Sequence, residues 1–473
     1  MDLHLDLDGL ARHAAAQITA GLRDAVRSGR LAAGTRLPPS RALAADIGVS
    51  RGPVVEAYEQ LAAEGLLVSR QGAGTWVAGL PHRPARSLRP AAEPAAAPAP
   101  VRYDLRPGTP DLAGFPRKQW LAALRYAAAV LPHHQLGYCD PAGLPGLRAE
   151  LAGYLRRVRA ADTSADDVVV VAGVAQGLSL TARALVTTGR RLLAVEDPTS
   201  VRTRPLLQAA GARLVPVPVD GEGLDVASLR RTPARSVLLT PAHQYPTGVV
   251  LSARRRAALA DWAAEADAIV VEDDYDAEFR YDREPVGCLQ GLAPERTVLI
   301  GSVSKSLAPG LRLGWVAAPP WLAHALRLGR AHADLGSPAL DQAALAQLIA
   351  SGSYDRHLRR MRRRYRARRD ALVNALNRWL PAARVHGVSA GVHLLLELPP
   401  GCQEADAAAA AAARGIAVDQ VAPMTAAPGG PPALVLGYAR LPEHHLTDAA
   451  RLLAHAVHDA QARAATSKGP GKP

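Results

Sequence analysis

Lys305 is the residue whose type and setting most directly suggest covalent chemistry. The chain has 56 lysine and arginine side chains, of which only Lys118, Lys305, Lys468 and Lys472 are lysines. A primary amine can form a Schiff base with a carbonyl compound, whereas a guanidinium cannot. Lys305 follows an apolar run and lies in a loop of small residues, SVSKSLAPG. This setting favours a chemical role over that of an ordinary surface lysine.

Two residues of a nearby acidic run can supply further groups that pyridoxal phosphate needs. This cofactor requires a Schiff-base amine, an acid at its pyridine nitrogen, a donor to its phenolic oxygen and a cradle for its phosphate. Asp273 follows the apolar run AIVVE and can hold the pyridine nitrogen protonated, and Tyr275 can donate to the phenolic oxygen. Ligands of α/β proteins bind at the carboxyl ends of strands, where both residues are expected. Taken alone, the run EDDYD is more typical of a solvated loop.

The phosphate cradle is predicted at two places. The segment GVAQG lies between an apolar run and a helical stretch, so its amides and the helix N-terminus suit an anion. Its candidate ligands are Val174, Ala175 and Gln176. Residues close to Lys305 can add hydroxyl groups and a charge-assisted hydrogen bond, and these are Ser302, Ser304 and Arg312.

The elements that position these residues alternate along the chain. Helical stretches separate five apolar runs, at 168–172, 192–195, 236–240, 268–273 and 297–301. This pattern predicts an α/β domain whose mainly parallel sheet has helices on both faces. We place this domain at 102–465. It is preceded by an N-terminal domain at 1–80 and a linker rich in proline, alanine and arginine at 81–101, and followed by a disordered tail at 466–473.

The N-terminal domain has the pattern of a helix-turn-helix. An amphipathic helix is expected from about Arg12 to Ser28. A short helix capped by Ser40 follows, then a turn at Gly48 and a second helix capped by Ser50. The segment EGLLVSRQGAGTWVA then predicts two strands that form a wing. The pattern alone leaves a small capping domain as an equal alternative.

Composition narrows the class of protein. The formal net charge is +13, which suggests a polyanionic partner but is weak evidence for one. Residues 1–80 contain as many acidic side chains as arginines, so DNA binding there must depend on pattern. The N-terminus lacks the features of a signal peptide. Cysteines and histidines do not have ligand spacing, so we expect a cytoplasmic protein without a metal site or membrane span.

The N-terminal sequence resembles the GntR-type winged helix. The resemblance covers GRLAAGTRLPPSRALAADIGVSR at 29–51, AYEQLAAEGL at 57–66 and RQGAGTWV at 70–77. It implies binding to double-stranded DNA through Arg41, Arg51 and the wing at Gly72 and Gly74, with Ser50 more suited to capping than to base contact. The family usually has threonine where this chain has Pro53, so a hydroxyl contact to DNA is lost there.

The large domain resembles aminotransferase-fold enzymes, and the whole chain resembles the MocR/GabR regulators. The motifs that carry this resemblance are RPGTPDL, LGYCDPAGLPGLR, HQYPTG, EDDYDAEF and SKSLAPGLRLG. It implies an aminotransferase fold with a smaller C-terminal α+β subdomain, and a head-to-tail homodimer. It also implies pyridoxal phosphate on Lys305, with Asp273 at the pyridine nitrogen, Tyr275 at the phenolic oxygen and Arg312 at the phosphate.

Three departures from the aminotransferase pattern bear on activity. Tyr245 replaces an asparagine that contacts the phenolic oxygen, and Ser200 stands where a ring-stacking tyrosine is common. Val435 occupies the position of the arginine that clamps the substrate carboxylate, and Arg440, five residues on, need not reach the site. Arg202 and Arg204 are nearer candidates for an anionic effector.

These features predict a transcriptional regulator that senses a small effector, with a working aminotransferase as the alternative. A third possibility is that pyridoxal phosphate is itself the effector. The basic segment at 356–369 has Leu358, Met361 and Tyr365 at helical spacing. We interpret it as a helix with one buried stripe and a solvated arginine face, and the alternative is a surface that guides DNA by phosphate contacts.

Overall fold

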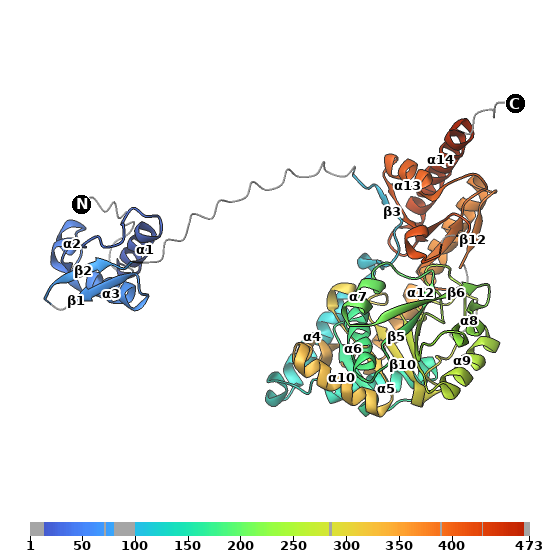
Figure 1. Ribbon diagram of the computed structural model, residues 1–473, viewed down its shortest axis with the longest axis horizontal. Helices are drawn as coiled ribbons and strands as arrows, with labels where there is room; N and C mark the ends of the chain where they lie inside the picture. The colour runs from blue at the N-terminus through green and yellow to red at the C-terminus, as the bar shows by residue number, and fades with distance from the viewer. Residues whose placement is uncertain are drawn as a thin grey trace. The chain divides into compact units, whose positions relative to one another are not determined.

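The computed structural model describes residues 14–70, 72–79, 100–282, 286–387, 390–427 and 429–467. The chain divides into two compact units, Met1–Ala97 and Pro98–Pro473, which are drawn in Figure 1. The predicted linker at 81–101 lies outside the described residues except for its last two positions. None of the described helices is both long and apolar enough to cross a membrane.

The small unit is a three-helix bundle with a two-stranded wing. Its elements are α1 (Ala14–Arg27), α2 (Ser40–Asp46), α3 (Arg51–Ala63), β1 (Leu67–Arg70) and β2 (Gly74–Val77). Strands β1 and β2 pair antiparallel. The core contains apolar residues from every helix, among them Ile18, Leu22, Leu43, Val54 and Leu61. Gly48 makes the turn between α2 and α3 with a φ of 69°, a value that favours glycine.

The capping prediction for this unit needs correction. Pro39, not Ser40, is the N-cap of α2, and it cannot donate or accept through its side chain. Ser40 begins the helix, and its hydroxyl accepts a hydrogen bond from Arg51 Nε at 3.3 Å. Ser50 is the N-cap of α3, but the structure gives it no side-chain capping bond. Ser40 therefore connects the first residues of the two helices instead of capping one of them.

The large unit is built on an eight-stranded sheet in the order β4-β11-β10-β9-β8-β5-β6-β7. Strands β8, β9 and β10 run parallel to one another, as do β8, β5 and β6. Strand β11 is antiparallel to both of its neighbours. The strands are β4 (Val168–Val171), β5 (Leu192–Asp197), β6 (Arg213–Asp220), β7 (Gly223–Leu224), β8 (Ser236–Leu239), β9 (Ile269–Asp274), β10 (Thr297–Ser302) and β11 (Gly314–Ala317). The predicted mixed, mainly parallel sheet is confirmed.

Helices cover both faces of this sheet (Figure 1). Val169 and Val171 of β4 pack with α6 and α10, whereas Val168 and Val170 point into the opposite core, which includes α5 and α11. Helix α9 packs on that second face farther along the sheet. The helices are α4 (Arg117–Val130), α5 (Pro145–Arg159), α6 (Val174–Thr187), α7 (Thr203–Ala209), α8 (Val226–Arg230), α9 (Ala253–Glu265), α10 (Pro320–Ala333) and α11 (Ala339–Ala350), with 3-10 turns η1 (Leu112–Gly114), η2 (His133–Leu136), η3 (Ala165–Asp167), η4 (Pro294–Arg296) and η5 (Pro309–Leu311).

The C-terminal part adds a smaller sheet in the order β12-β13-β16-β15. A separate two-stranded pair joins β3 to β14, so the first described segment of the large unit is bound to its C-terminal part. The elements are β3 (Tyr103–Asp104), α12 (Ser353–Trp379), β12 (Arg384–His386), β13 (His393–Glu397), α13 (Glu404–Ala413), β14 (Ile416–Ala417), β15 (Asp419–Gln420), η6 (Ala422–Met424), β16 (Ala433–Gly437) and α14 (Glu443–Ser467). Because α14 reaches Ser467, the predicted tail begins two residues too early.

The arginine-rich segment lies in α12, and its buried stripe of Leu358, Met361 and Tyr365 is confirmed. The remaining face is largely solvated, since six of the nine arginines at 356–369 are exposed. Several arginines of the segment also donate to main-chain carbonyls or pair with acids, as Arg362 does with the carbonyl of Glu278 at 3.0 Å. The arginines with such contacts are Arg356, Arg360, Arg362, Arg364, Arg366, Arg368 and Arg369.

The acidic run that ends β9 is buried, not solvated. Glu272 and Asp274 are 0% and 8% exposed. Arg159, at the end of α5, binds Asp274 through Nε at 2.7 Å and through its terminal nitrogen at 3.0 Å. Glu272 accepts hydrogen bonds from the amides of Leu289 and Gln290. Arg159 therefore neutralises one carboxylate of the run inside the protein.

Replacing Arg159 with methionine should destabilise the large unit strongly. The substitution leaves the buried carboxylate of Asp274 unpaired, which costs about 3–5 kcal/mol of unfolding free energy. Arg230→Met is a matched control, because the Arg230–Glu265 pair has side chains that are 38% and 62% exposed and should contribute less than about 1 kcal/mol. Urea unfolding of the purified protein would measure both. Equal losses in the two variants would contradict this account.

Candidate cofactor site and nucleic-acid interface

Lys305 lies in the turn after β10 and points toward the segment that follows β3. Its Nζ donates a hydrogen bond to the carbonyl of Gly108 at 2.5 Å. Gly108 has a φ of 98°, and a side chain there would begin 3.7 Å from Nζ. Burial lowers the pKa of Lys305, although Asp276 and Asp273 act in the opposite direction. The lysine is thus a partly desolvated amine, which loses its proton more readily than one in water.

Asp273 lies near the end of β9, directly beside the strand that leads to Lys305. Thr297 to Gly301 of β10 pair in register with Val270 to Asp274 of β9, so Asp273 is opposite Ile300. Its Oδ1 is buried and has no hydrogen-bond partner among the described residues. Burial, reinforced by Asp274, raises the pKa of Asp273 to about 7. A buried acceptor without a partner is costly, so this carboxyl is suited to a donor that comes from a ligand.

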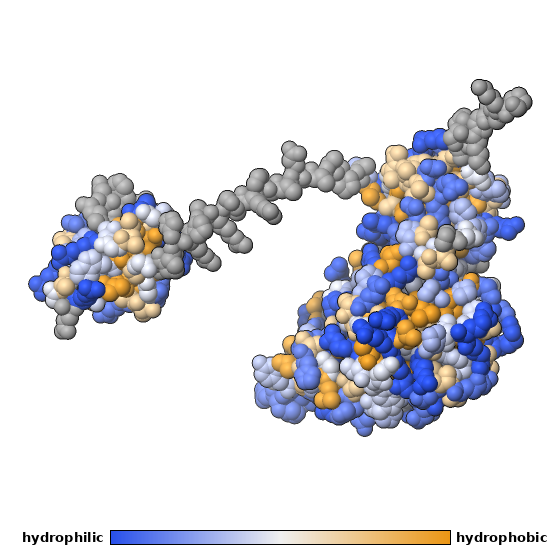
Figure 2. Space-filling view, viewed as in Figure 1, coloured by the Kyte–Doolittle hydropathy of each residue, from blue (hydrophilic) through white to orange (hydrophobic). Residues whose placement is uncertain are grey.

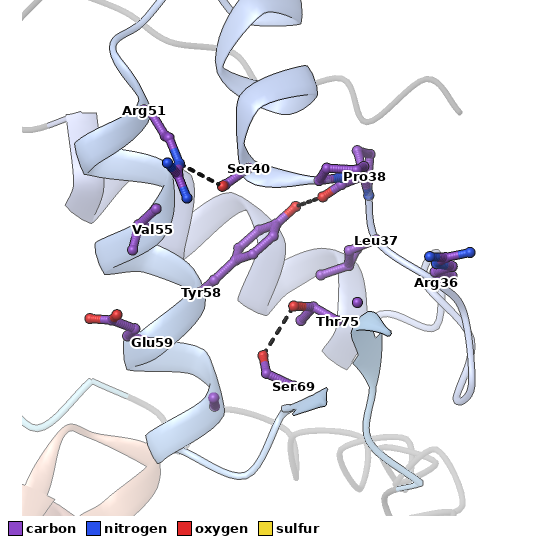
Figure 3. A pocket seen from close by; sticks show the side chains of 13 residues that line it. Arg36, Leu37, Pro38, Ser40, Arg51, Val55, Tyr58, Glu59, Ser69 and Thr75 are labelled. Carbon is purple, nitrogen blue, oxygen red and sulfur yellow. Dashed lines mark hydrogen bonds between the residues drawn. The ribbon is translucent and has the colours of Figure 1, made fainter. Parts of the chain in front are cut away.

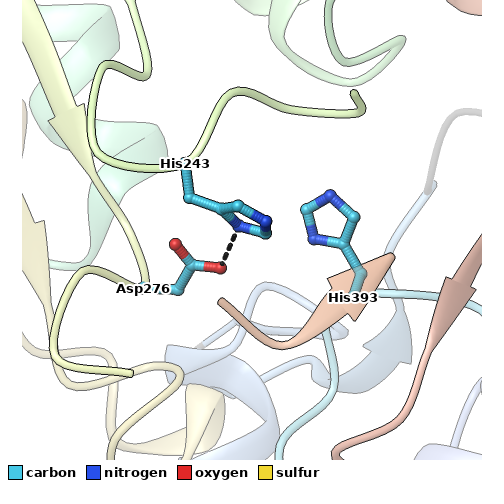
Figure 4. A group of neighbouring side chains, drawn as sticks. All are labelled: His243, Asp276 and His393. Carbon is cyan, nitrogen blue, oxygen red and sulfur yellow. Dashed lines mark hydrogen bonds and ion pairs between the residues drawn. The ribbon is translucent and has the colours of Figure 1, made fainter. Parts of the chain in front are cut away.

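Tyr275 is held by two buried residues, His243 and Asp276, which are drawn in Figure 4. Its hydroxyl donates to the carbonyl of His243 at 2.9 Å and lies 3.2 Å from His243 Nδ1. That nitrogen is 3.0 Å from Asp276 Oδ2, which also accepts from the amide of Val392. If Asp276 keeps the proton on Nδ1, the same N–H faces the lone pairs of the Tyr275 oxygen. The single proton of Tyr275 is donated to the carbonyl of His243 here, so donation to a ligand would require the hydroxyl to exchange that acceptor for the ligand.

His393 completes this cluster from the small sheet. Its ring lies 4.5 Å from that of His243 and 5.1 Å from that of Tyr245, measured between centroids. His243, Asp276 and His393 offer ligand atoms within 4.8 Å of one another. However, the two nitrogens of an imidazole point in different directions, and the Nδ1 of His243 already bonds to Asp276. The arrangement in Figure 4 therefore serves hydrogen bonding around Tyr275 better than it serves ligation. His393 was not among the predicted residues, because nothing in its sequence setting indicates a position beside Tyr245.

The predicted cradle comes together around Gly173, the N-cap of α6. A Cβ at Gly173 would lie 3.2 Å from the guanidinium of Arg312, so the absence of a side chain leaves room beside that charge. Arg312 also donates to the carbonyl of Ala172. The first-turn amides of α6, at Val174 and Ala175, have no acceptor within the helix. Ser302 and Ser304 lie on the Lys305 side, where the Ser304 amide donates to Ser302 Oγ at 3.3 Å.

Gln176 does not contribute its side chain to this cradle. Its Oε1 accepts from the amide of Ala172 at 2.7 Å and from Arg330, and its Nε2 donates to Asp334 at 2.8 Å. Its own amide donates to the carbonyl of Gly173 at 3.1 Å. These bonds fix the start of α6, so Gln176 shapes the cradle without facing an anion.

The effector candidates separate into engaged and free residues. Arg204 donates to the carbonyl of Met424 and lies 3.8 Å from Asp197, so it holds η6 against α7. Arg440 pairs with Asp104. Arg202 is exposed at the N-cap of α7, and no partner for its side chain exists among the described residues. Of the arginines considered for an effector, Arg202 alone is therefore without a hydrogen-bond or ion-pair partner for its side chain among the described residues.

The small unit presents a groove between α3 and the wing (Figure 3). The groove has a volume of about 530 Å³ and includes Ser40 and Arg51 at one side and Thr75 and Gly74 at the other. Arg36 also lines it, and its guanidinium lies 5.8 Å from the centre of the Trp76 ring. Arg41 is exposed in the first turn of α2, and Gly72 at the tip of the wing has a φ of 78°. The structure thus adds Arg36 to the candidate DNA contacts.

An apolar surface lies over α4 and the turn after it. Apolar patches interrupt the polar surface of the large unit (Figure 2). Leu121, Tyr126 and Val130 are about half exposed on α4, and Tyr138 is 92% exposed after η2. A hollow of about 230 Å³ lies between α4, α5 and α11. Contiguous apolar patches on soluble proteins often mark contact surfaces.

Comparisons with known proteins agree with this geometry. Residues 108–453 match the family model of aminotransferase class I and II, and residues 14–77 match that of the bacterial regulatory proteins of the gntR family. The chain is 25% identical to the multiple substrate aminotransferase of Thermococcus profundus. That structure superposes with a TM-score of 0.71 over 77% of this chain and 93% of its own.

Two curated relatives, both transcriptional regulators, match most of the chain. The probable rhizopine catabolism regulatory protein MocR of Rhizobium meliloti is 36% identical over 77% of each chain. The pyridoxine biosynthesis transcriptional regulator PdxR of Corynebacterium glutamicum is 38% identical over 80% of this chain and 82% of its own. The chain therefore belongs to the MocR-type transcriptional regulators, in which a GntR-family DNA-binding domain is joined to an aminotransferase-like domain.

Proposed function

We propose that this regulator binds pyridoxal phosphate on Lys305 and alters its binding to operator DNA in response to a small effector. The effector is an amino compound or the cofactor itself. The observation that carries the proposal is the buried carboxyl of Asp273, whose Oδ1 has no partner among the described residues, near the desolvated amine of Lys305.

The residues present fit this cofactor in each of its parts. A protonated pyridine nitrogen would give Asp273 the donor that it lacks, and the ion pair would offset the cost of its burial. Tyr275, oriented by His243 and Asp276, would donate to the phenolic oxygen. Arg312 and the first amides of α6 would hold the phosphate. Pyridoxal phosphate, when bound, supplies an electron sink for a bound amine.

Regulation is a better account than catalysis because the site lacks a carboxylate anchor on β16. Val435 is fully buried, and its neighbours in register are Leu395 and Asp419. Neither side chain can form the bidentate bond that orients a substrate carboxylate. The same absence supports a sensor of the cofactor itself, and the PdxR relative is a transcriptional regulator of pyridoxine biosynthesis.

Operator binding would use the groove of the small unit. Arg51 at the start of α3, Arg36 beside the wing and Arg41 on α2 supply positive charge to one surface. The apolar surface over α4 supports a head-to-tail homodimer, because burying Leu121, Tyr126 and Val130 against a second copy would remove them from water. A dimer would place two small units on one operator with paired or repeated half-sites.

Lys305 should be the residue that holds the cofactor covalently. Borohydride reduction of the purified protein with pyridoxal phosphate should fix one label, and peptide mass spectrometry should locate it on Lys305. Lys305→Ala should abolish the label because no other amine of the described residues lies beside Asp273. Lys118→Ala is the matched control, since Lys118 is exposed on α4. A label that persists in the Lys305 variant would contradict the proposal.

Arg51 should carry a large share of the DNA affinity. Arg51→Ala should cost about 1–3 kcal/mol on the operator if it contacts a base edge, with relaxed preference at one position. If it contacts only phosphate, affinity should fall equally on all sequences, and the salt dependence should become shallower. Fluorescence anisotropy on operator and unrelated DNA at several salt concentrations separates these cases. Unchanged binding on both would remove α3 from the interface.

The large unit should be a poor aminotransferase. Misplacement of the reacting carbon reduces rate steeply, and no arginine on β16 fixes the substrate carboxylate. We expect at most half-reactions when a panel of amino acids is tested with 2-oxoglutarate or pyruvate and keto acids are quantified. Sustained turnover at about 1–10³ per second would show that this chain is an enzyme.

A further inference from the structure

One face of the small sheet looks toward the proposed cofactor site. On β13, Leu394 and Leu396 belong to the main core, so His393 and Leu395 point to the other face. The ring of His393 lies against that of Tyr245, 5.1 Å away between centroids. Leu395 is paired with Val435, and the other neighbour of Val435 in register is Asp419 on β15. Directly opposed residues share a face, so Asp419 lies on the same side as His393.

Asp419 brings a carboxylate to this face without a partner. It is half-buried, and the described chain offers it no hydrogen bond or ion pair. Burial raises the pKa of Asp419, with Arg106 and Arg202 acting against the shift. Arg106 is already committed to Asp104, at 2.8 and 2.9 Å. The carboxylate also raises the pKa of Tyr245, after burial, which agrees with its position beside that ring.

The residues around Asp419 determine the charge of the ligand group that can bind beside it. Val435 and Leu395 add apolar surface and no charge next to it. An anionic group placed next to Asp419 would stand beside a partly desolvated carboxylate and be repelled. An ammonium group in the same place would give Asp419 a charge-assisted hydrogen bond. The subsite is therefore opposite in sign to one that clamps a carboxylate.

We propose that Asp419 makes this subsite bind the cationic far end of an amine ligand, such as a linear diamine, and reject ligands that end in a carboxylate. This inference rests on the proposed function, because the near end of the ligand lies at the cofactor on Lys305. Arg202 lies on the exposed side of the same site and attracts anions. The preference for a cationic over an anionic ligand end therefore depends on Asp419.

The test uses three ligands that differ only at the far end: butane-1,4-diamine, butylamine and 4-aminobutanoate, each with its three- and five-carbon homologues. Their affinities for the cofactor-loaded full chain are measured by isothermal titration calorimetry, with the cofactor absorbance as a second readout. At the best length the diamine should bind roughly tenfold to a hundredfold more tightly than the amino acid, the range expected for one charge-assisted bond.

Three variants make the result specific. Asp419→Asn keeps the shape of the side chain and should remove the preference for diamine, with the amino acid now bound best because Arg202 remains. Arg202→Gln should keep or increase the preference. Asp406→Asn, at an exposed acid on α13, should change nothing. Thermal melting and cofactor retention show that each variant is folded.

The proposal is overturned if the wild-type chain binds the amino acid as tightly as the diamine at every length, binds none of the ligands, or keeps its preference in Asp419→Asn. Failure of the proposed function has a different signature. In that case borohydride fixes no cofactor on Lys305, whichever ligand is present.

Discussion

The site depends on the burial of several carboxylates at the end of β9 beside the buried guanidinium of Arg159. Arg159 binds Asp274, while Glu272 is held by two backbone amides. These contacts leave Asp273, between them in the chain, without a partner for its Oδ1. A strand alternates its side chains, so neighbouring acids can have separate roles. Glu272 and Asp274 stabilise the fold, and we propose that Asp273 is available to a ligand.

Much of the fold and the candidate residues of the site could be predicted from the sequence, because both depend on short-range sequence patterns. Apolar runs gave β4, β5, β8, β9 and β10, and the scarcity of lysine singled out Lys305. The antiparallel strand β11 was missed, since direction depends on pairing across the sheet. Ser40 was mistaken for a cap because a proline before it had the required backbone angles.

Contacts between distant segments were the part that could not be predicted. The charge pattern on α12 correctly indicated that most of its arginines are exposed. It did not indicate their partners, which come from distant segments, such as Asp111 for Arg364 and Arg368. The pairing of Asp419 with Val435 depends on strand register, which the sequence does not display. His393 lies beside Tyr245 for the same reason. The residues that we propose to define ligand preference therefore came only from the structure.

The hydrogen bond from Lys305 to Gly108 connects the lysine directly to a segment in the N-terminal half of the chain. The segment that reaches Gly108 is fastened by β3 to β14, and the carbonyl of Leu105 accepts from Gly437 at 2.6 Å. If Nζ bonds to the carbon of a cofactor, as proposed, it has fewer N–H groups to donate, and the carbonyl of Gly108 loses this donor. The bonding state of one nitrogen would then change the hydrogen bonding of the segment that β3 joins to the C-terminal part of the large unit.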